Sequence, residues 1–484
     1  MTTVVNLKKL LHRKAWELVT PTTSSTNAGS FLCGDKAGVL PTRNSYFFVN
    51  GVSSIFNYNA DEDSWIQLPN SGISGAYAAG ACGEFRALGA LGGSFDQAVT
   101  AGTTTTLTTN KTITRNLKDC VVRVISGTGV GYSGKVVSNT IGTNSVLTVT
   151  PANSVAFDAT TVFRIWSGSL WFFNSGTSAV GFSVYDRATN VWTAKSVTNL
   201  PTSWGTTGQL VSTPSSDGSF DTGTSTGSNT TTTLIQTTKA WATNCWTNYQ
   251  VRITSGTGAG QIRTISSNTA TTITVSVAWT VTPDATSGYV IEGNDDFMYL
   301  LGNNAVTLYK YVVSTNTWAT VTPGSARASG MGGGGTADWI AGVKDTDWDG
   351  GKGLTLTGSF PKQNGRYIYS FRGAGSSALD LYDIAGNTWV AVSYGAQSET
   401  FTTGSSSVDF EGKIYITKEA TGRVFVFDVA NHELVPLAWS PYPQSTTVEG
   451  DKLLVIPFKD EGTTIPFLYL QHHTRTEITR MLLV

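Results

Sequence analysis

The chain has 484 residues, of which 40% are hydrophobic, 11% aromatic and 13% charged, and its formal net charge is -1. This near-neutral balance excludes a strong global field that would attract nucleic acid or an anionic membrane. No stretch approaches the roughly 20 apolar residues of a membrane span, and the first residues lack a signal-peptide pattern. We therefore expect neither stable membrane insertion nor secretion by a signal peptide.

The residue content favours β-structure and assembly. Abundant Gly, Thr and Ser are typical of strands and turns. The low charged fraction is typical of a surface that packs against neighbours. The cysteines Cys33, Cys82, Cys120 and Cys245 show no CxxC spacing, so we predict buried, reduced thiols.

Short apolar runs separated by Gly- or Asn-containing turns predict a series of antiparallel hairpins. The predicted first strands are 46–49, 170–173, 297–301, 367–371, 414–416 and 453–456. Their predicted partner strands are 55–58, 182–185, 306–311, 379–382, 424–427 and 467–470. Residues 14–21 predict one more strand, which is expected to pair with the last hairpin and close a ring of sheets.

In four of these hairpins an aromatic residue stands seven positions before a Trp. A fixed internal spacing between unevenly separated copies indicates one supersecondary unit used repeatedly. In the last two copies, Leu434 and Ile478 take the place of the Trp. The four aromatic pairs are Tyr58 and Trp65, Tyr185 and Trp192, Tyr311 and Trp318, and Tyr382 and Trp389.

Each unit is completed by an outer strand that starts at the Trp and by a Gly- and Ala-rich segment, such as 75–80, that opens the next unit. Four strands per unit, repeated around an axis, predict an all-β chain that forms a β-propeller of about six blades. The pattern resembles the kelch repeat family, whose blades carry a Gly-rich inner strand, a Tyr-Asp before a turn and a Trp in the outer strand. The clearest matches are Tyr185-Asp186 with Trp192 and Tyr382-Asp383 with Trp389, although the usual Gly-Gly after the second strand is largely missing.

Two long stretches that interrupt the series of hairpins resemble each other. They predict duplicated β modules, each inserted after the inner strand of a blade and before its second strand, on one face of the disc. They are similar to the small β-domains of tailed-bacteriophage virion proteins, particularly tail and particle-surface components. The matching segments are 93–96 with 218–221, 122–129 with 251–258, 137–140 with 266–269, and 158–160 with 284–286. The predicted domains are 1–92, 168–216 and 294–484 for the propeller, with 93–167 and 217–293 as the two inserted modules.

One loop carries carboxylates with the spacing of a cation site. Asp345, Asp347 and Asp349 alternate in a Gly-rich segment and are followed by Gly350. Such spacing resembles the opening of calcium-binding loops in propellers and EF-hands, but the later Glu of an EF-hand is missing. We interpret the loop as a solvated turn favoured by its Asp residues, with no cofactor; a Ca²⁺ site at these three residues, the only cofactor we consider, is the alternative.

Signals for catalysis are sparse. None of the four histidines, His12, His432, His472 and His473, lies in an HExxH motif. The Gly-rich segment 330–335 is not followed by the Lys-Ser/Thr of a phosphate-binding loop, so we interpret it as a close-packed inner strand. The residue sets of galactose oxidase and of sialidases do not map onto the chain. We expect no enzyme.

These observations predict a structural virion protein of a tailed bacteriophage. A tail component similar to the nozzle or hub proteins of short-tailed phages fits best, with other virion proteins as partners and a homo-oligomeric ring or array as the assembly. Its location would be the virion, in the phage tail, and specific nucleic-acid binding is not expected. The alternatives are an adhesin that binds host glycan through a propeller face, and a capsid or neck decoration protein.

Overall fold

The computed structural model is all-β over the residues that it describes. Among those residues, no helix is long and apolar enough to cross a membrane. The structure describes residues 16–19, 31–33, 44–48, 55–59, 63–73, 81–89, 97–111, 113, 117, 120–175, 180–186, 190–205, 207–212, 219–294, 296–302, 304–332, 336–339, 367–392, 394, 399–402, 405–410, 413–418, 421, 423–429, 432–439, 452–460, 463–471 and 478–483.

In the described part of the chain, five antiparallel sheets have four strands each. Four of these sheets take their strands in chain order, and the fifth has the order β1-β36-β35-β34. Their strands are β1 (Trp16–Val19), β2 (Phe31–Cys33), β3 (Asn44–Phe48), β4 (Ile55–Asn59), β5 (Ser64–Leu68), β16 (Gly208–Ser212), β23 (Phe297–Gly302), β24 (Leu308–Val312), β25 (Thr317–Val321), β26 (Thr336–Trp339), β27 (Tyr367–Phe371), β28 (Leu379–Asp383), β29 (Thr388–Val392), β30 (Ser407–Phe410), β31 (Lys413–Lys418), β32 (Arg423–Asp428), β33 (Glu433–Trp439), β34 (Lys452–Asp460), β35 (Thr463–Gln471) and β36 (Ile478–Leu482).

The same order recurs inside a ten-stranded sheet, as β6-β13-β14-β15. Its long strand β13 pairs with β6 through its second half and with β10 and β7 through its first half. The strands of this sheet are β6 (Cys82–Gly89), β7 (Gln97–Ala98), β8 (Ala101–Gly102), β9 (Thr106–Thr109), β10 (Val121–Ser126), β11 (Ser133–Asn139), β12 (Ser145–Thr150), β13 (Val162–Asn174), β14 (Gly181–Asp186) and β15 (Val191–Ala194).

The remaining sheet lies in the chain between β16 and β23 and has six strands in the order β17-β22-β19-β20-β21-β18. Its strands are β17 (Ser219–Thr224), β18 (Thr233–Ile235), β19 (Gln250–Ser255), β20 (Ile262–Asn268), β21 (Thr272–Val275) and β22 (Gly288–Glu292).

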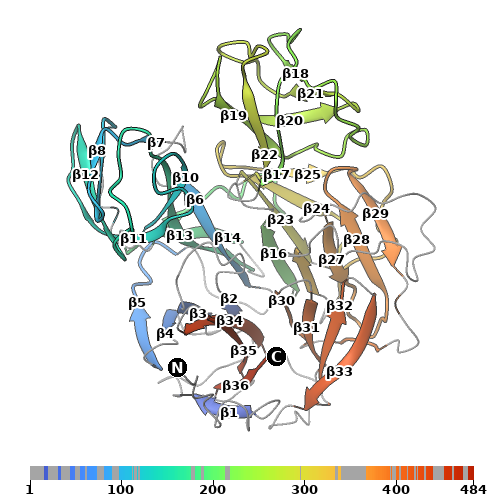
Figure 1. Cartoon of the computed structure of the whole chain (residues 1–484). Helices are drawn as coiled ribbons and strands as arrows, with labels where there is room; N and C mark the ends of the chain where they lie inside the picture. The colour runs from blue at the N-terminus through green and yellow to red at the C-terminus, as the bar shows by residue number, and fades with distance from the viewer. Residues whose placement is uncertain are drawn as a thin grey trace, which may run out of the picture.

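One edge strand of each four-stranded set contacts an edge strand of the next set, and these contacts form a closed circuit. The circuit runs β2, β6, β16, β26, β30, β34 and back to β2. Figure 1 shows the sheets arranged around a common centre, with β5, β29 and β33 on the outside and β7–β12 and β17–β22 at the periphery. The fold is therefore an all-β, propeller-like arrangement of antiparallel sheets, as expected.

The spacing of seven residues between Tyr and Trp has a simple structural cause. Tyr58 lies directly opposite Trp65 in the β4–β5 ladder, and the three other pairs occupy the same register in their own hairpins. The ring centroids of the four pairs are 4.9, 5.2, 5.0 and 5.1 Å apart. Cross-strand aromatic pairs at this distance stabilise a hairpin beyond the area they bury.

A residue five positions after the Tyr completes each hairpin, and the sequence analysis missed it. The Tyr311 hydroxyl donates a hydrogen bond of 2.7 Å to Oδ1 of Asn316, whose φ is 54°. Asn and Asp tolerate this left-handed backbone better than most other non-Gly residues, which suits them to the turn. The same bond joins Tyr58 to Asp63, Tyr185 to Asn190 and Tyr382 to Asn387, and each acceptor has a positive φ.

The hairpin ends also connect neighbouring sheets. The Trp192 indole donates to the carbonyl oxygen of Pro69, 2.8 Å away, and the Trp318 indole donates to the carbonyl oxygen of Ser196, 2.9 Å away. At the next junction the Asn387 amide donates to the carbonyl oxygen of Thr322 over 2.9 Å instead. Each acceptor follows the Trp of the preceding sheet by four residues. The repeated unit therefore includes its own link to the next sheet.

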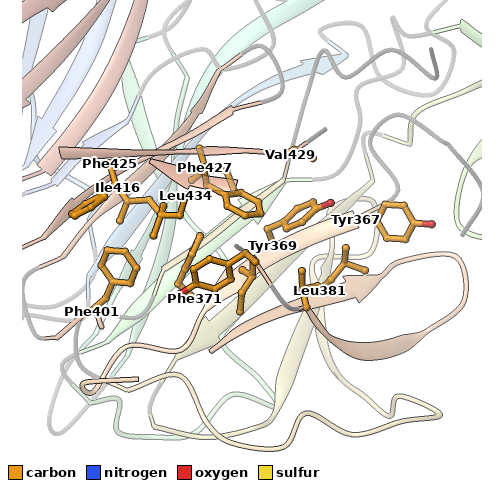
Figure 2. Packing of buried hydrophobic residues seen from close by; sticks show 14 residues of the cluster. Tyr367, Tyr369, Phe371, Leu381, Phe401, Ile416, Phe425, Phe427, Val429 and Leu434 are labelled. Carbon is orange, nitrogen blue, oxygen red and sulfur yellow. The ribbon is translucent and has the colours of Figure 1, made fainter. Parts of the chain in front are cut away.

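Apolar side chains fill the space between adjacent sheets. Figure 2 shows Tyr369 and Phe371 of β27 lying against Phe427 of β32. The rings of Phe371 and Phe427 meet edge to face at 5.8 Å. Neighbouring sheets therefore share one core, which makes each sheet depend on the next.

The Gly-rich segments that the sequence predicts as inner strands are described only in part. Residues 75–80 lie outside the described residues, and β6 begins at Cys82. Gly330 and Gly332 lie in a loop before β26. A Cβ at Gly332 would lie 2.5 Å from the Cβ of Ala374, so this glycine permits close packing against a neighbouring loop.

The N-terminal strand pairs as predicted. Trp16–Val19 forms an antiparallel ladder with β36, in which Trp16 faces Met481 and Val19 faces Ile478. The first described strand therefore completes the sheet built by the last three, and it covers a strand edge that would otherwise be unpaired.

We predict that Asn316→Ala lowers the free energy of unfolding by about 1–3 kcal/mol. The substitution removes the acceptor for the Tyr311 hydroxyl and for the Ser196 amide, and it places Ala at a positive φ. Asn316→Gly removes the same hydrogen bonds without the backbone strain, so its loss should be smaller. Urea denaturation of both variants measures the difference; equal losses would exclude a contribution from the backbone.

We predict that removal of residues 1–19 lowers the thermal midpoint and causes association that increases with protein concentration. The reason is that β36 loses its partner strand and becomes an edge. Removal of residues 1–15 keeps β1 and serves as the control. Differential scanning fluorimetry and size-exclusion chromatography measure the two effects, and equal behaviour of both truncations would contradict the prediction.

Candidate functional site

The candidate calcium loop lies outside the described residues, as do Asp345, Asp347 and Asp349 themselves. In the part of the chain that the structure describes, no group of three or more His, Cys, Asp or Glu side chains is placed to hold a metal ion. The Ca²⁺ site therefore stays an alternative interpretation of the sequence.

Among the predicted thiols, Cys82, Cys120 and Cys245 form no disulfide and are buried, as expected. Of the histidines, only His432 lies in the described residues. It occupies the turn position that Asn316 and its counterparts hold elsewhere, with φ of 53°, and it packs against Phe427. Phe427 lacks the hydroxyl that would need an Asn acceptor, so both members of the Tyr–Asn pair are replaced together.

The features that set this chain apart from a plain ring of sheets are the two sets of inserted strands. We call residues 97–166 module 1 and residues 219–292 module 2. Each lies in the chain between the first and second strands of a four-stranded set, β6 and β13 for module 1 and β16 and β23 for module 2. They occupy neighbouring sets, because β6 and β16 are in contact.

Both modules close into small barrels. In module 1, the Val99 amide donates to the carbonyl oxygen of Thr161 and the Thr100 amide to that of Thr108, over 2.9 and 2.8 Å. In module 2, the Ser225 and Thr226 amides make the equivalent bonds to Ser287 and Ile235, also 2.9 and 2.8 Å long. Closure leaves few unpaired strand edges.

The two barrels are filled from equivalent positions. Each core contains alternating residues of the strands that carry the shared motif, so that side chains on one face of each strand meet inside. The buried pairs related by the motifs and the strand register are Leu107 and Leu234, Val122 and Val251, Val124 and Ile253, Val136 and Ile265, Leu147 and Ile273, Val149 and Val275, Phe163 and Tyr289, and Ile165 and Ile291. The modules are therefore two copies of one β-structure.

The end of module 1 farthest from β6 is built by a Thr–Asp–Thr network. Asp158 accepts hydrogen bonds from the Thr160 hydroxyl at 2.6 Å and from the Thr128 hydroxyl at 2.8 Å. The Thr160 amide donates to the same carboxylate at 2.8 Å. The Thr160 and Thr128 hydroxyls, in that order, are the main causes of a lowered pKa of Asp158.

Module 2 repeats this network atom for atom. Asp284 accepts from the Thr286 and Thr257 hydroxyls at 2.6 and 2.7 Å, and its pKa is lowered by the same two contacts. A left-handed glycine faces the network in each copy. A Cβ at Gly127 would lie 1.8 Å from the carbonyl oxygen of Thr160, and one at Gly256 would lie 2.1 Å from that of Thr286. We call this end of each module its tip.

Each tip exposes an apolar side chain at the same position. Val155 is 47% exposed in module 1, and its counterpart Val281 is 50% exposed in module 2. Both stand three residues before the Asp of the network. Val130 and Val277 add a further exposed valine to the tips of module 1 and module 2. The tips are thus surfaces whose turns are hydrogen-bonded and which carry both apolar and polar groups.

Polar contacts join module 2 to the ring of sheets. The Asn248 amide donates to the carbonyl oxygen of Ile384 at 3.1 Å, and its Oδ1 accepts from Nζ of Lys310 at 3.2 Å. Lys310 lies on β24, with Nζ 3.6 Å from the centre of the Phe297 ring. Burial lowers the pKa of Lys310 to about 8, because the charged form loses hydration. Asn248 therefore joins module 2 to two neighbouring sheets.

The sequence matches no protein-family model and no curated protein. Among solved structures, the chain is similar to a chain in the crystal structure of the mitotic checkpoint complex, with 8% identity, a TM-score of 0.32, and coverage of 97% of this chain and 94% of that one. It is also similar to the tricorn protease (9% identity, TM-score 0.22, 91% and 34% covered) and to a GH74 enzyme from Niastella koreensis (11%, 0.22, 93% and 77%). The likeness to these distant propeller-containing proteins concerns the arrangement of sheets and carries no functional inference.

We predict that His432→Asn weakens the loss of stability on acidification. Burial lowers the pKa of His432 to about 4 from its ordinary 6.5, so the unfolded chain takes up this proton first. The contribution of the neutral side chain is therefore complete above pH 6.5 and is lost as the pH falls toward 4. The difference amounts to up to about 3 kcal/mol. Thermal midpoints of parent and variant across this range measure it; identical pH profiles would contradict the assignment.

Proposed function

We propose that the chain is a structural virion protein of a tailed bacteriophage, a nozzle- or hub-like tail component that works through protein–protein assembly. The observation that carries the proposal is the duplication of one barrel at equivalent places in two neighbouring sheets of a closed ring. Two equal modules on one closed ring of sheets are suited to making repeated contacts with neighbouring subunits.

The architecture that we propose for this role is a kelch-like propeller of six blades with two inserted β domains. Its support is the circuit of contacts from β2 through β34 and the recurrent four-stranded order. The proposed domains are 1–92, 168–216 and 294–484 for the propeller and 93–167 and 217–293 for the insertions. The ring would be held by β1, which completes the last blade.

The proposal assigns the chain to the phage tail, with other virion proteins and further copies of itself as partners, and it assigns no catalytic reaction. The surfaces offered for these contacts are the tips, where the Thr–Asp–Thr networks fix the turns and the valines are exposed. Rigid turns with apolar groups lose little entropy when a partner covers them.

A glycan-binding adhesin is the second candidate, because one large aromatic side chain is held at the surface. Trp439 is 61% exposed, and the Arg423 guanidinium lies 4.7 Å from the centre of its ring. Glu399 pairs with both Arg423 and Lys418, which fixes the Arg beside the Trp. Exposed Trp and Arg side chains are common at binding sites.

We predict that the purified chain forms rings or arrays, and that replacing residues 217–293 by a short Gly-Ser linker abolishes them while the remaining sheets stay folded. The linker keeps β16 and β23 adjacent, since these strands pair directly. Mass photometry and negative-stain electron microscopy report assembly, and circular dichroism reports folding. A monomer whose thermal midpoint rises with host saccharides would overturn the structural role in favour of the adhesin.

A further inference from the structure

The two modules meet at a buried ion pair. Arg164 of β13 donates to both carboxylate oxygens of Glu292 at the end of β22, over 2.6 and 3.0 Å. The side chains are 1% and 2% exposed. Arg252 of β19 donates to the same carboxylate at 2.7 Å, and its side chain is 12% exposed. One Glu thus receives one Arg from each module.

The strand register explains why these side chains face outward from their barrels. Phe163 and Ile165 point into the core of module 1, so Arg164 between them projects from the opposite face. Glu292 lies opposite Gln250, and Arg252 lies opposite Val290, which places Glu292 and Arg252 diagonally on one face of module 2. The bond from Arg252 is therefore internal to module 2, and the bond from Arg164 joins the modules.

The residues of this contact are not a shared feature of the duplicated fold. Arg123 and Arg252 occupy equivalent places in the shared motif, and they lie opposite Arg164 and Val290, respectively. The counterpart of Arg164 in module 2 is thus an apolar residue. By the same register the counterpart of Glu292 in module 1 is Trp166. Each copy has a charge where the other has an apolar residue, so the contact belongs to this particular pairing of modules.

We propose that Arg164 and Glu292 form an ionic lock that fixes the orientation of module 1 relative to module 2. A bidentate Arg–carboxylate pair requires coplanar groups at one distance, so rotation of either barrel breaks it. Because both side chains are withdrawn from water, breaking the pair deprives the buried Arg164 of this carboxylate, while Glu292 keeps its bond from Arg252. The lock therefore holds the two tips at one mutual spacing. The proposed lock is argued from these contacts and is independent of the function proposed for the modules.

The test measures the distance between the tips with spin labels. Ala152 and Ala259 are exposed at the two tips and accept labels through Ala→Cys substitutions, in a background with Cys33→Ser. The remaining cysteines, Cys82, Cys120 and Cys245, are buried. Double electron–electron resonance on the full chain should give a narrow distance distribution for the parent.

Two matched substitutions separate the lock from the pair inside module 2. Arg164→Met removes the bond between modules and leaves the bond from Arg252 to Glu292, so the distribution should broaden and its mean should shift. Arg252→Met removes the internal bond to Glu292 but keeps the bond from Arg164, so it should leave the distribution narrow. Circular dichroism shows whether each variant folds; Glu292→Gln, which keeps the shape of the side chain, replaces Arg164→Met if that variant does not fold. An unchanged distribution in the folded Arg164→Met or Glu292→Gln variant would overturn the lock.

Discussion

The contact on which the rest of the structure depends is the cross-strand pair of Tyr and Trp. The Tyr hydroxyl of this pair donates to an Asn or Asp whose backbone is left-handed. The pair fixes the register of a hairpin, because the two rings meet only when the residues lie opposite each other. The same unit reaches the preceding sheet through the Trp318 indole. One short element thus sets both the strand pairing inside a sheet and the contact between sheets.

Closure follows from repeating this unit. Adjacent sheets share apolar cores at several junctions, and β1 supplies the last strand from the other end of the chain. In such a ring an insertion costs little stability when the strands on either side of it remain paired, and both modules obey this condition, since β6 still pairs with β13 and β16 with β23. The ring can therefore carry large additional domains without losing its core.

The two modules show how duplicated structures diverge. Their barrels keep the same core positions and the same network around Asp158 and Asp284, because turns and packing tolerate few alternatives. Their outer faces differ, and there the buried pair of Arg164 and Glu292 joins one copy to the other. Such a buried pair contributes more to a defined geometry than to stability, because its Coulomb energy is largely offset by the loss of hydration.

The sequence by itself determined the hairpins, the spacing of seven residues, the N-terminal strand and the likeness of the modules, because these depend on local periodicity and on repeated motifs. It also contained Asn316 and its counterparts, five positions after each Tyr, although their role is visible only once the backbone angle is known. Only the tertiary structure decided that the glycines 330 and 332 serve a loop contact, and that Arg164 meets Glu292 across 128 residues of chain. Contacts between distant segments depend on the folding of everything between them, so no local pattern specifies them.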